Sequence, residues 1–221
     1  MKVGQCKTKE NTHLPYIRPA TNNYFGFQPV SAADGNIQTN PYLVSSSEGA
    51  IYTGDVVVFT SINTIRAITG AFSSMIAGVS AGFLAANGGS TAATLSVNTS
   101  QLALVYDNPY QVFVTCDTTS GLIGSTGMFK NVAVLSSGAV GSTGPNTAAP
   151  LNRSVMAISG VTASSGLALP FKVLGLHPIE NNSISTDAGG AGVAASVRKW
   201  LVTPNNHIFA KGVGQYGVIT S

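Results

Sequence analysis

Residues 101–116, QLALVYDNPYQVFVTC, contain two short apolar runs separated by a turn signal. Asp107, Asn108 and Pro109 all favour turns, since Asp and Asn side chains bond to nearby backbone and Pro fixes its own backbone angle. The Val, Phe and Thr residues on either side favour strands. This stretch therefore predicts a β-hairpin with its turn at residues 107–109.

The same pattern recurs along most of the chain. Short runs rich in Val, Ile, Phe, Tyr and Thr alternate with Gly, Asn, Ser or Pro. The predicted strand runs are 42–45, 50–53, 55–60, 64–69, 75–84, 94–97, 101–107, 110–116, 130–135, 154–158, 167–176, 197–202, 207–210 and 216–220. Many short strands with turn signals between them favour an antiparallel sheet protein. The predicted fold class is all-β, with a single β-barrel or β-sandwich body.

The composition excludes several other classes of protein. Of the 221 residues, 44% are hydrophobic and only 9% are charged, whereas disordered chains combine low hydrophobicity with high net charge. The chain has no heptad pattern of a coiled coil or helical bundle. Cys6 and Cys116 stand far apart and the three histidines are scattered, so we expect free thiols and no metal or cofactor, with a single bridge between the two cysteines as the alternative.

The net charge of +3 lies entirely in the first twenty residues. Lys2, Lys7, Lys9 and Arg18 stand there against Glu10, and the rest of the chain is balanced. Nucleic-acid binding requires a dense face of Lys and Arg to displace counterions from phosphates. A neutral body with one basic segment does not supply that face, so no nucleic-acid partner is expected.

The basic segment belongs to a region that we predict to be an extended N-terminal arm, residues 1–40, followed by the β-rich body, residues 41–221. Pro15, Pro19 and Pro29 punctuate the arm, which lacks helical periodicity. The predicted partner contacts are the basic residues and the aromatic residues of this arm: Lys2, Lys7, Lys9, Tyr16, Arg18, Tyr24, Phe25 and Phe27. The alternative is that the aromatics belong to the body's own core, above all Phe27.

Residues 67–86 form a stretch without a charge that is long enough to cross a membrane. Its internal Gly and Ser residues and the lack of flanking Trp and Tyr argue against a span. We predict instead two buried strands joined near residues 71–74, and no membrane partner.

Residues 78–82, GVSAG, match the nucleophile-elbow pattern G-x-S-x-G, and Asp187 and His207 follow in the chain order of an α/β-hydrolase. That motif needs a strand before the serine and a helix after it, but the chain reaches Asn-Gly-Gly at residues 87–89. The protein is therefore predicted not to be an enzyme and to have no small-molecule substrate. A serine hydrolase using Ser80, Asp187 and His207 remains a remote alternative.

Several motifs, taken in order, resemble the small head proteins of tailed, mainly short-tailed, bacteriophages. These motifs are YFGFQPV at 24–30, IYTGDVVV at 51–58, IAGVSAGF at 76–83, YDNP at 106–109, LPFKVLGL at 169–176, and KWLV with NNH at 199–207. The resemblance covers residues 24–209, and it assigns Ser80 to a strand. Residues 1–23 depart from it, because the arm is longer than the pattern.

The resemblance implies a capsid decoration, or cement, protein. Such a protein is made in the host cytoplasm, binds the major capsid protein on the outside of the virion and stabilises the shell, often as a homotrimer. An alternative within the same particle is a β-rich tail or fibre component.

Overall fold

The computed structural model describes residues 25–32, 35–44, 51–72, 75–84, 91–92, 102–118, 123–136, 154–165, 169–178 and 198–210. Within these ranges the regular structure consists of strands and one short 3-10 turn, η1 (Ser125–Gly127). The strands form two sheets. The all-β prediction is confirmed.

The larger sheet has seven strands, among them the first and the last strand of the described residues. They are β1 (Gln28–Ala32), β5 (Ala71–Phe72), β9 (Gln111–Cys116), β10 (Asn131–Leu135), β11 (Ala157–Ser164), β12 (Phe171–Leu176) and β13 (Lys199–Pro204). Their order is β1-β9-β13-β12-β10-β11, with β5 also pairing with β10, and all pairs are antiparallel. We call this the seven-stranded sheet.

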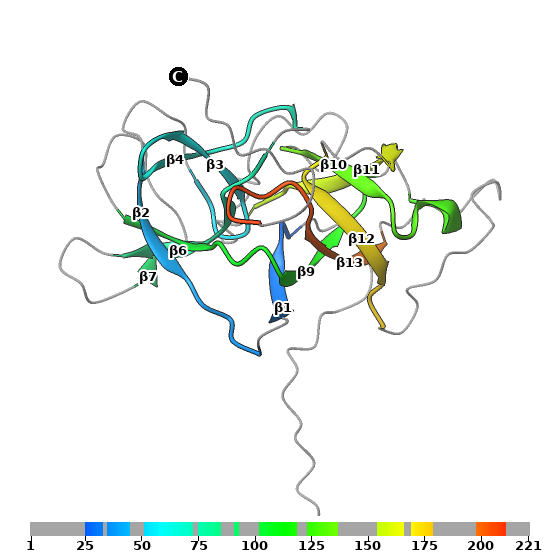
Figure 1. Cartoon of the computed structure of the whole chain (residues 1–221), viewed down its shortest axis with the longest axis horizontal. Coiled ribbons are helices and arrows are strands. Elements are labelled where there is room, and N and C mark those ends of the chain that lie inside the picture. Colours follow the sequence, from blue (N-terminus) through cyan, green and yellow to red (C-terminus); the bar gives the residue numbers. More distant parts are fainter. Residues whose placement is uncertain are drawn as a thin grey trace, which may run out of the picture.

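The second sheet closes on itself. Its strands are β2 (Asn40–Val44), β3 (Val56–Ser61), β4 (Thr64–Ala67), β6 (Gly78–Leu84), β7 (Thr91–Ala92) and β8 (Leu102–Tyr106). The order is β3-β4-β2-β8-β6-β7, and β3 also pairs with β6, so five of the strands form a closed ring. Figure 1 shows β2, β3, β4 and β6 on one side of the molecule and β10, β11, β12 and β13 on the other.

The valine run at residues 56–58 explains how the two layers pack. Successive side chains of a strand point to opposite faces. Val56 and Val58 belong to the core cluster that includes Trp200 of the seven-stranded sheet, whereas Val57 belongs to the cluster inside the ring with Phe83. The first half of β3, residues 56–58, is therefore buried on both faces, and the main core lies between the ring and the seven-stranded sheet.

The predicted hairpin at residues 101–116 is wrong, although its turn is present. Asn108 accepts backbone hydrogen bonds from Gln111 N at 3.1 Å, through its carbonyl oxygen, and from Tyr110 N at 2.9 Å, through its side chain. Strand β8 before the turn pairs within the ring, but β9 after it pairs within the seven-stranded sheet. The turn carries the chain from one layer to the other.

The predicted boundary of the arm is also wrong at its C-terminal end. Strand β1 lies within the expected arm of residues 1–40, yet it pairs with β9, and β2 begins at Asn40. Pro29 lies in an edge strand, where the missing N–H costs little, and not in an extended arm. The described part of the body thus begins at Phe25, and residues 1–24 lie outside the described residues.

The long uncharged stretch contains strands, as predicted, but the predicted join near residues 71–74 is wrong in part, because residues 71–72 form β5, which pairs with β10. Its described residues include the end of β4, all of β5 and all of β6. The described part of the chain contains no helix of the length and hydropathy that a membrane crossing requires. The expected strand at 207–210 is instead a turn with one bridge at His207, and the expected strands at 94–97 and 216–220 lie outside the described residues.

Candidate functional site

Most of the predicted partner contacts lie outside the described residues. This holds for Lys2, Lys7, Lys9, Tyr16, Arg18 and Tyr24. The two that are described, Phe25 and Phe27, are 7% and 1% exposed. Phe27 stacks on Phe171 with ring centroids 4.6 Å apart, in the main core. As a partner anchor Phe27 is a wrong prediction, and the core alternative is right.

Phe25 and Phe27 lie on opposite faces of the seven-stranded sheet. Phe25 packs with Val114 and Cys116, whereas Phe27 joins the main core. Gly26 between them has φ +70°, a left-handed conformation that favours glycine. Phe27 N donates to Gly54 O at 3.0 Å, which holds this kink. The chain therefore enters the body from the outer face of the sheet, the face turned away from the ring.

A basic side chain covers this entry point. The ammonium group of Lys199 lies 5.7 Å from the centroid of the Phe25 ring, a cation–π arrangement. Burial raises the pKa of the neighbouring Cys116 thiol to about 12, so this cysteine stays protonated and unreactive. Cys6 lies outside the described residues.

Ser80 lacks the setting of a nucleophile elbow. It is fully buried in the middle of β6, whose strand continues to Leu84 where the elbow requires a helix. His207 is also buried, and its Nδ1 accepts a hydrogen bond from Phe209 N at 3.1 Å. Asp187 lies outside the described residues. The strand assignment of Ser80 is thus confirmed, and the G-x-S-x-G match owes nothing to an elbow.

Asp117 accepts hydrogen bonds from three different donors. One oxygen, Oδ1, accepts from Arg198 N at 2.7 Å, and Oδ2 accepts from Ile123 N and Trp200 Nε1, both at 3.0 Å. The Arg198 guanidinium also donates to Ile123 O at 2.8 Å. Burial raises the pKa of Asp117, and these donors oppose that rise. The group ties β9 to the start of β13.

The other two described carboxylates are buried as well. Asp55 accepts from Tyr52 N at 2.8 Å, and burial raises its pKa to about 6. Asp107 accepts from Asn40 Nδ2 and, at 2.5 Å, from the Tyr42 hydroxyl; burial and this bond raise the pKa of Tyr42. All three described carboxylates are therefore buried and accept hydrogen bonds from groups of the protein itself.

The basic side chains are distributed in the opposite way. The described ones, all at least partly exposed, are Arg66, Lys130, Lys172, Arg198 and Lys199. The described surface is therefore positively charged, although the chain beyond residue 20 is balanced in charge. A count of charges along the sequence misses this, because it does not show which aspartates are buried.

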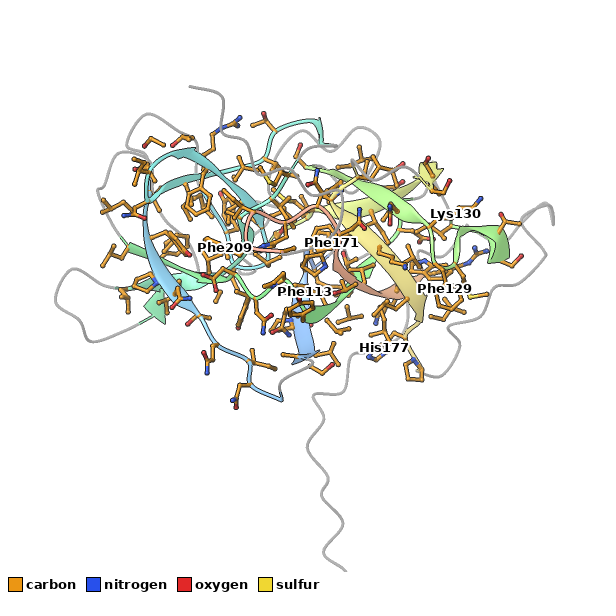
Figure 2. The ribbon with its side chains drawn as sticks, viewed as in Figure 1. Phe113, Phe129, Lys130, Phe171, His177 and Phe209 are labelled. Atoms are coloured by element: carbon orange, nitrogen blue, oxygen red, sulfur yellow. The ribbon has the colours of Figure 1, made fainter. Side chains whose placement is uncertain are left out.

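An exposed aromatic residue also escaped the sequence analysis. Phe129 is 67% exposed and has φ +61°, a strained conformation for a bulky residue. Its N–H donates to Val173 O, and Val173 N donates to Lys130 O, both at 2.9 Å, so β12 holds the strained turn. Figure 2 shows Phe129 and Lys130 together at one end of the molecule, far from Phe209.

Acidification is expected to act on stability through two buried groups with opposite signs. The folded-state pKa of Asp55 is raised by burial to about 6, so the fold gains stability as the pH falls from about 6 towards 4. Burial lowers the pKa of His207 from 6.5 to about 4, so stability is lost as the pH falls through that window. In wild-type protein the two effects largely cancel.

The variant Asp55→Asn removes the gain in stability that comes from protonating Asp55, and it leaves the loss that comes from His207. We expect its free energy of unfolding to drop by about 3 kcal/mol between pH 7 and pH 4, and the wild-type value to drop by about 2 kcal/mol less. Urea unfolding across this pH range measures both curves. Parallel curves for the two proteins would contradict the assignment to Asp55.

No protein-family model, curated protein sequence or solved structure matches this chain. Among the described residues, no three or more His, Cys, Asp or Glu side chains gather into a group that could hold a metal ion. The features that carry a functional argument are the positive charge of the described surface and the entry of the chain into the body at Phe25.

Proposed function

We propose that this chain is a structural virion protein that binds the outer surface of a phage capsid and stabilises the shell. The observation that carries the proposal is that the excess positive charge and the folded β body lie in separate parts of the chain. All of the excess positive charge lies in residues 1–20, which precede a two-layer β body whose three described carboxylates are buried. A basic tether on a compact body suits attachment to an acidic lattice, and the order of the motifs at residues 24–209 supports the same function.

The proposed partner is the major capsid protein, bound on the virion exterior by the arm as a clamp. Fully extended, residues 1–24 could reach on the order of 80 Å, at about 3.3 Å per residue, which is enough to cross a neighbouring subunit. Lys2, Lys7, Lys9 and Arg18 steer the arm to its track, and Tyr16 and Tyr24 anchor it. Three copies around a symmetry position would add avidity to weak single contacts, and a cryo-EM reconstruction of decorated shells would show that arrangement.

Deleting residues 1–20 tests the clamp. The truncated protein should remain folded and soluble, because Phe25 and everything after it in the described core are intact. Its affinity for undecorated shells of the phage that encodes the chain should fall by about a hundredfold or more, since charge and anchors are lost together. Co-sedimentation over a salt titration measures the affinity.

A matched variant separates charge from anchoring. Replacing Lys2, Lys7, Lys9 and Arg18 by glutamine keeps Tyr16 and Tyr24, so it should mainly weaken the salt dependence. Undiminished binding of the truncated protein at every salt concentration would show that the arm is not the clamp. Failure of the full-length protein to bind shells, with binding to purified tails instead, would favour the tail or fibre alternative.

A further inference from the structure

The outer face of the seven-stranded sheet carries the exposed Lys172 together with the partly buried Lys199, Leu201 and Thr203. In β13, Trp200 and Val202 belong to the main core, so Lys199, Leu201 and Thr203, which alternate with them, point to the outer face. The exposed Lys172 of β12 lies opposite Thr203 in the sheet and shares that face. We call the set Lys172, Lys199, Leu201 and Thr203 the outer patch.

Lys172, the exposed cation of the outer patch, has no acidic neighbour on the described surface. The carboxylates of Asp55, Asp107 and Asp117 are all buried, so none of them is available to neutralise Lys172 at the surface. Lys172 therefore gives the patch a positive potential toward an approaching partner, and this potential is stronger at low ionic strength.

The arm enters the body on the same face. Phe25 packs with Val114 and Cys116, Leu201 of the outer patch packs against them, and Lys199 covers the Phe25 ring. The arm carries a charge of +3 and would gain no attraction from a patch that is itself basic. An occupant of opposite charge is therefore favoured on this face of the body.

We propose that the outer patch docks the body on an acidic protein surface, so that the seven-stranded sheet lies against the partner and the ring points away. This inference rests on the proposed function where the partner is the capsid shell. A protein partner is favoured over nucleic acid because the patch holds only two cations and also includes Leu201, a mixture typical of protein interfaces and too sparse for phosphate binding.

The test compares two charge reversals in the full-length protein. Lys172→Glu alters the outer patch, and Arg66→Glu makes the same change in net charge on β4 of the ring. Both are assayed for affinity to undecorated shells by co-sedimentation, and for affinity to a short fluorescein-labelled poly-L-glutamate by anisotropy. Lys172→Glu should weaken both by about tenfold, since attraction turns into repulsion, while Arg66→Glu should change either by less than about twofold.

The controls distinguish a loss of folding from a change in charge as the cause of weaker binding. Thermal melts of both variants should match wild type, since neither side chain lies in the core clusters. Lys172→Gln, which removes the charge without reversing it, should give an intermediate loss and serves as a second variant if either reversal unfolds the protein.

The outcomes separate this inference from the proposed function. If wild type binds shells and the two reversals weaken binding equally, the docking face is refuted and the decoration function stands. If wild type does not bind shells, the decoration function is refuted, and equal affinities of the two variants for poly-L-glutamate would refute the docking face too. Tighter binding of oligo-dT than of poly-L-glutamate, lost in Lys172→Glu, would replace the protein partner with nucleic acid.

Discussion

Gly26→Ala is expected to lower the free energy of unfolding by about 4 kcal/mol or more, through crowding and backbone strain together. An added Cβ would lie 2.4 Å from Ser154 Cβ and 2.7 Å from the Gly54 carbonyl oxygen, so backbone and side chain must both move. The change also strains a residue with φ +70°. Phe25 and Phe27 would lose their places on the two faces of the sheet.

Gly35→Ala is the matched control. Gly35 has φ +76°, but a Cβ there would meet no atom within 4 Å. It should therefore cost only the strain of a left-handed alanine, about 1 kcal/mol. Urea unfolding of the two variants measures the difference, and equal losses would mean that the Phe25–Phe27 kink is not packed as described.

Asp117→Ala is expected to cost about 3 to 5 kcal/mol of unfolding free energy. The change leaves two buried donors, Ile123 N and Trp200 Nε1, and the part-buried Arg198 N without their acceptor. It also opens a cavity beside Trp200, which is itself fully buried. The indole fluorescence of Trp200, the single tryptophan of the chain, should shift to the red if water enters.

Asp107→Ala provides the comparison for this prediction. Its donors, Asn40 Nδ2 and the Tyr42 hydroxyl, are only partly buried and can turn to water. We expect a loss of about 1 to 2 kcal/mol. A larger loss for Asp107→Ala than for Asp117→Ala would show that the β9–β13 junction does not depend on the buried carboxylate.

The sequence predicts local structure well where a pattern is local. The valine run at 56–58 and the segment 111–116 form strands because β-branched and aromatic residues suit a pleated, buried surface. The turn at Asn108 forms from its own side-chain and backbone bonds. Phe27 could be suspected of core packing from its apolar side chain alone.

Long-range pairing is what the sequence does not show. Nothing in residues 101–116 reveals that β8 and β9 join different sheets, because both partners of β9 come from the far ends of the described chain. The same limit applies to the candidate site. Lys172 joins the outer patch only through its pairing with Thr203, and Phe129 is exposed only because η1 and β12 set the turn around it.

The position of β9 between β1 and β13 has a consequence for synthesis of the chain (Figure 1). The five strands of the ring lie within residues 40–106, so the ring can close as soon as residue 106 has left the ribosome. Strand β9 follows at once, but one of its edges stays open until residues 199–204 have been translated. Open strand edges recruit other chains. A nascent chain that stalls on the ribosome between residues 117 and 198 therefore has a closed ring, but the open edge of its strand β9 is prone to aggregation.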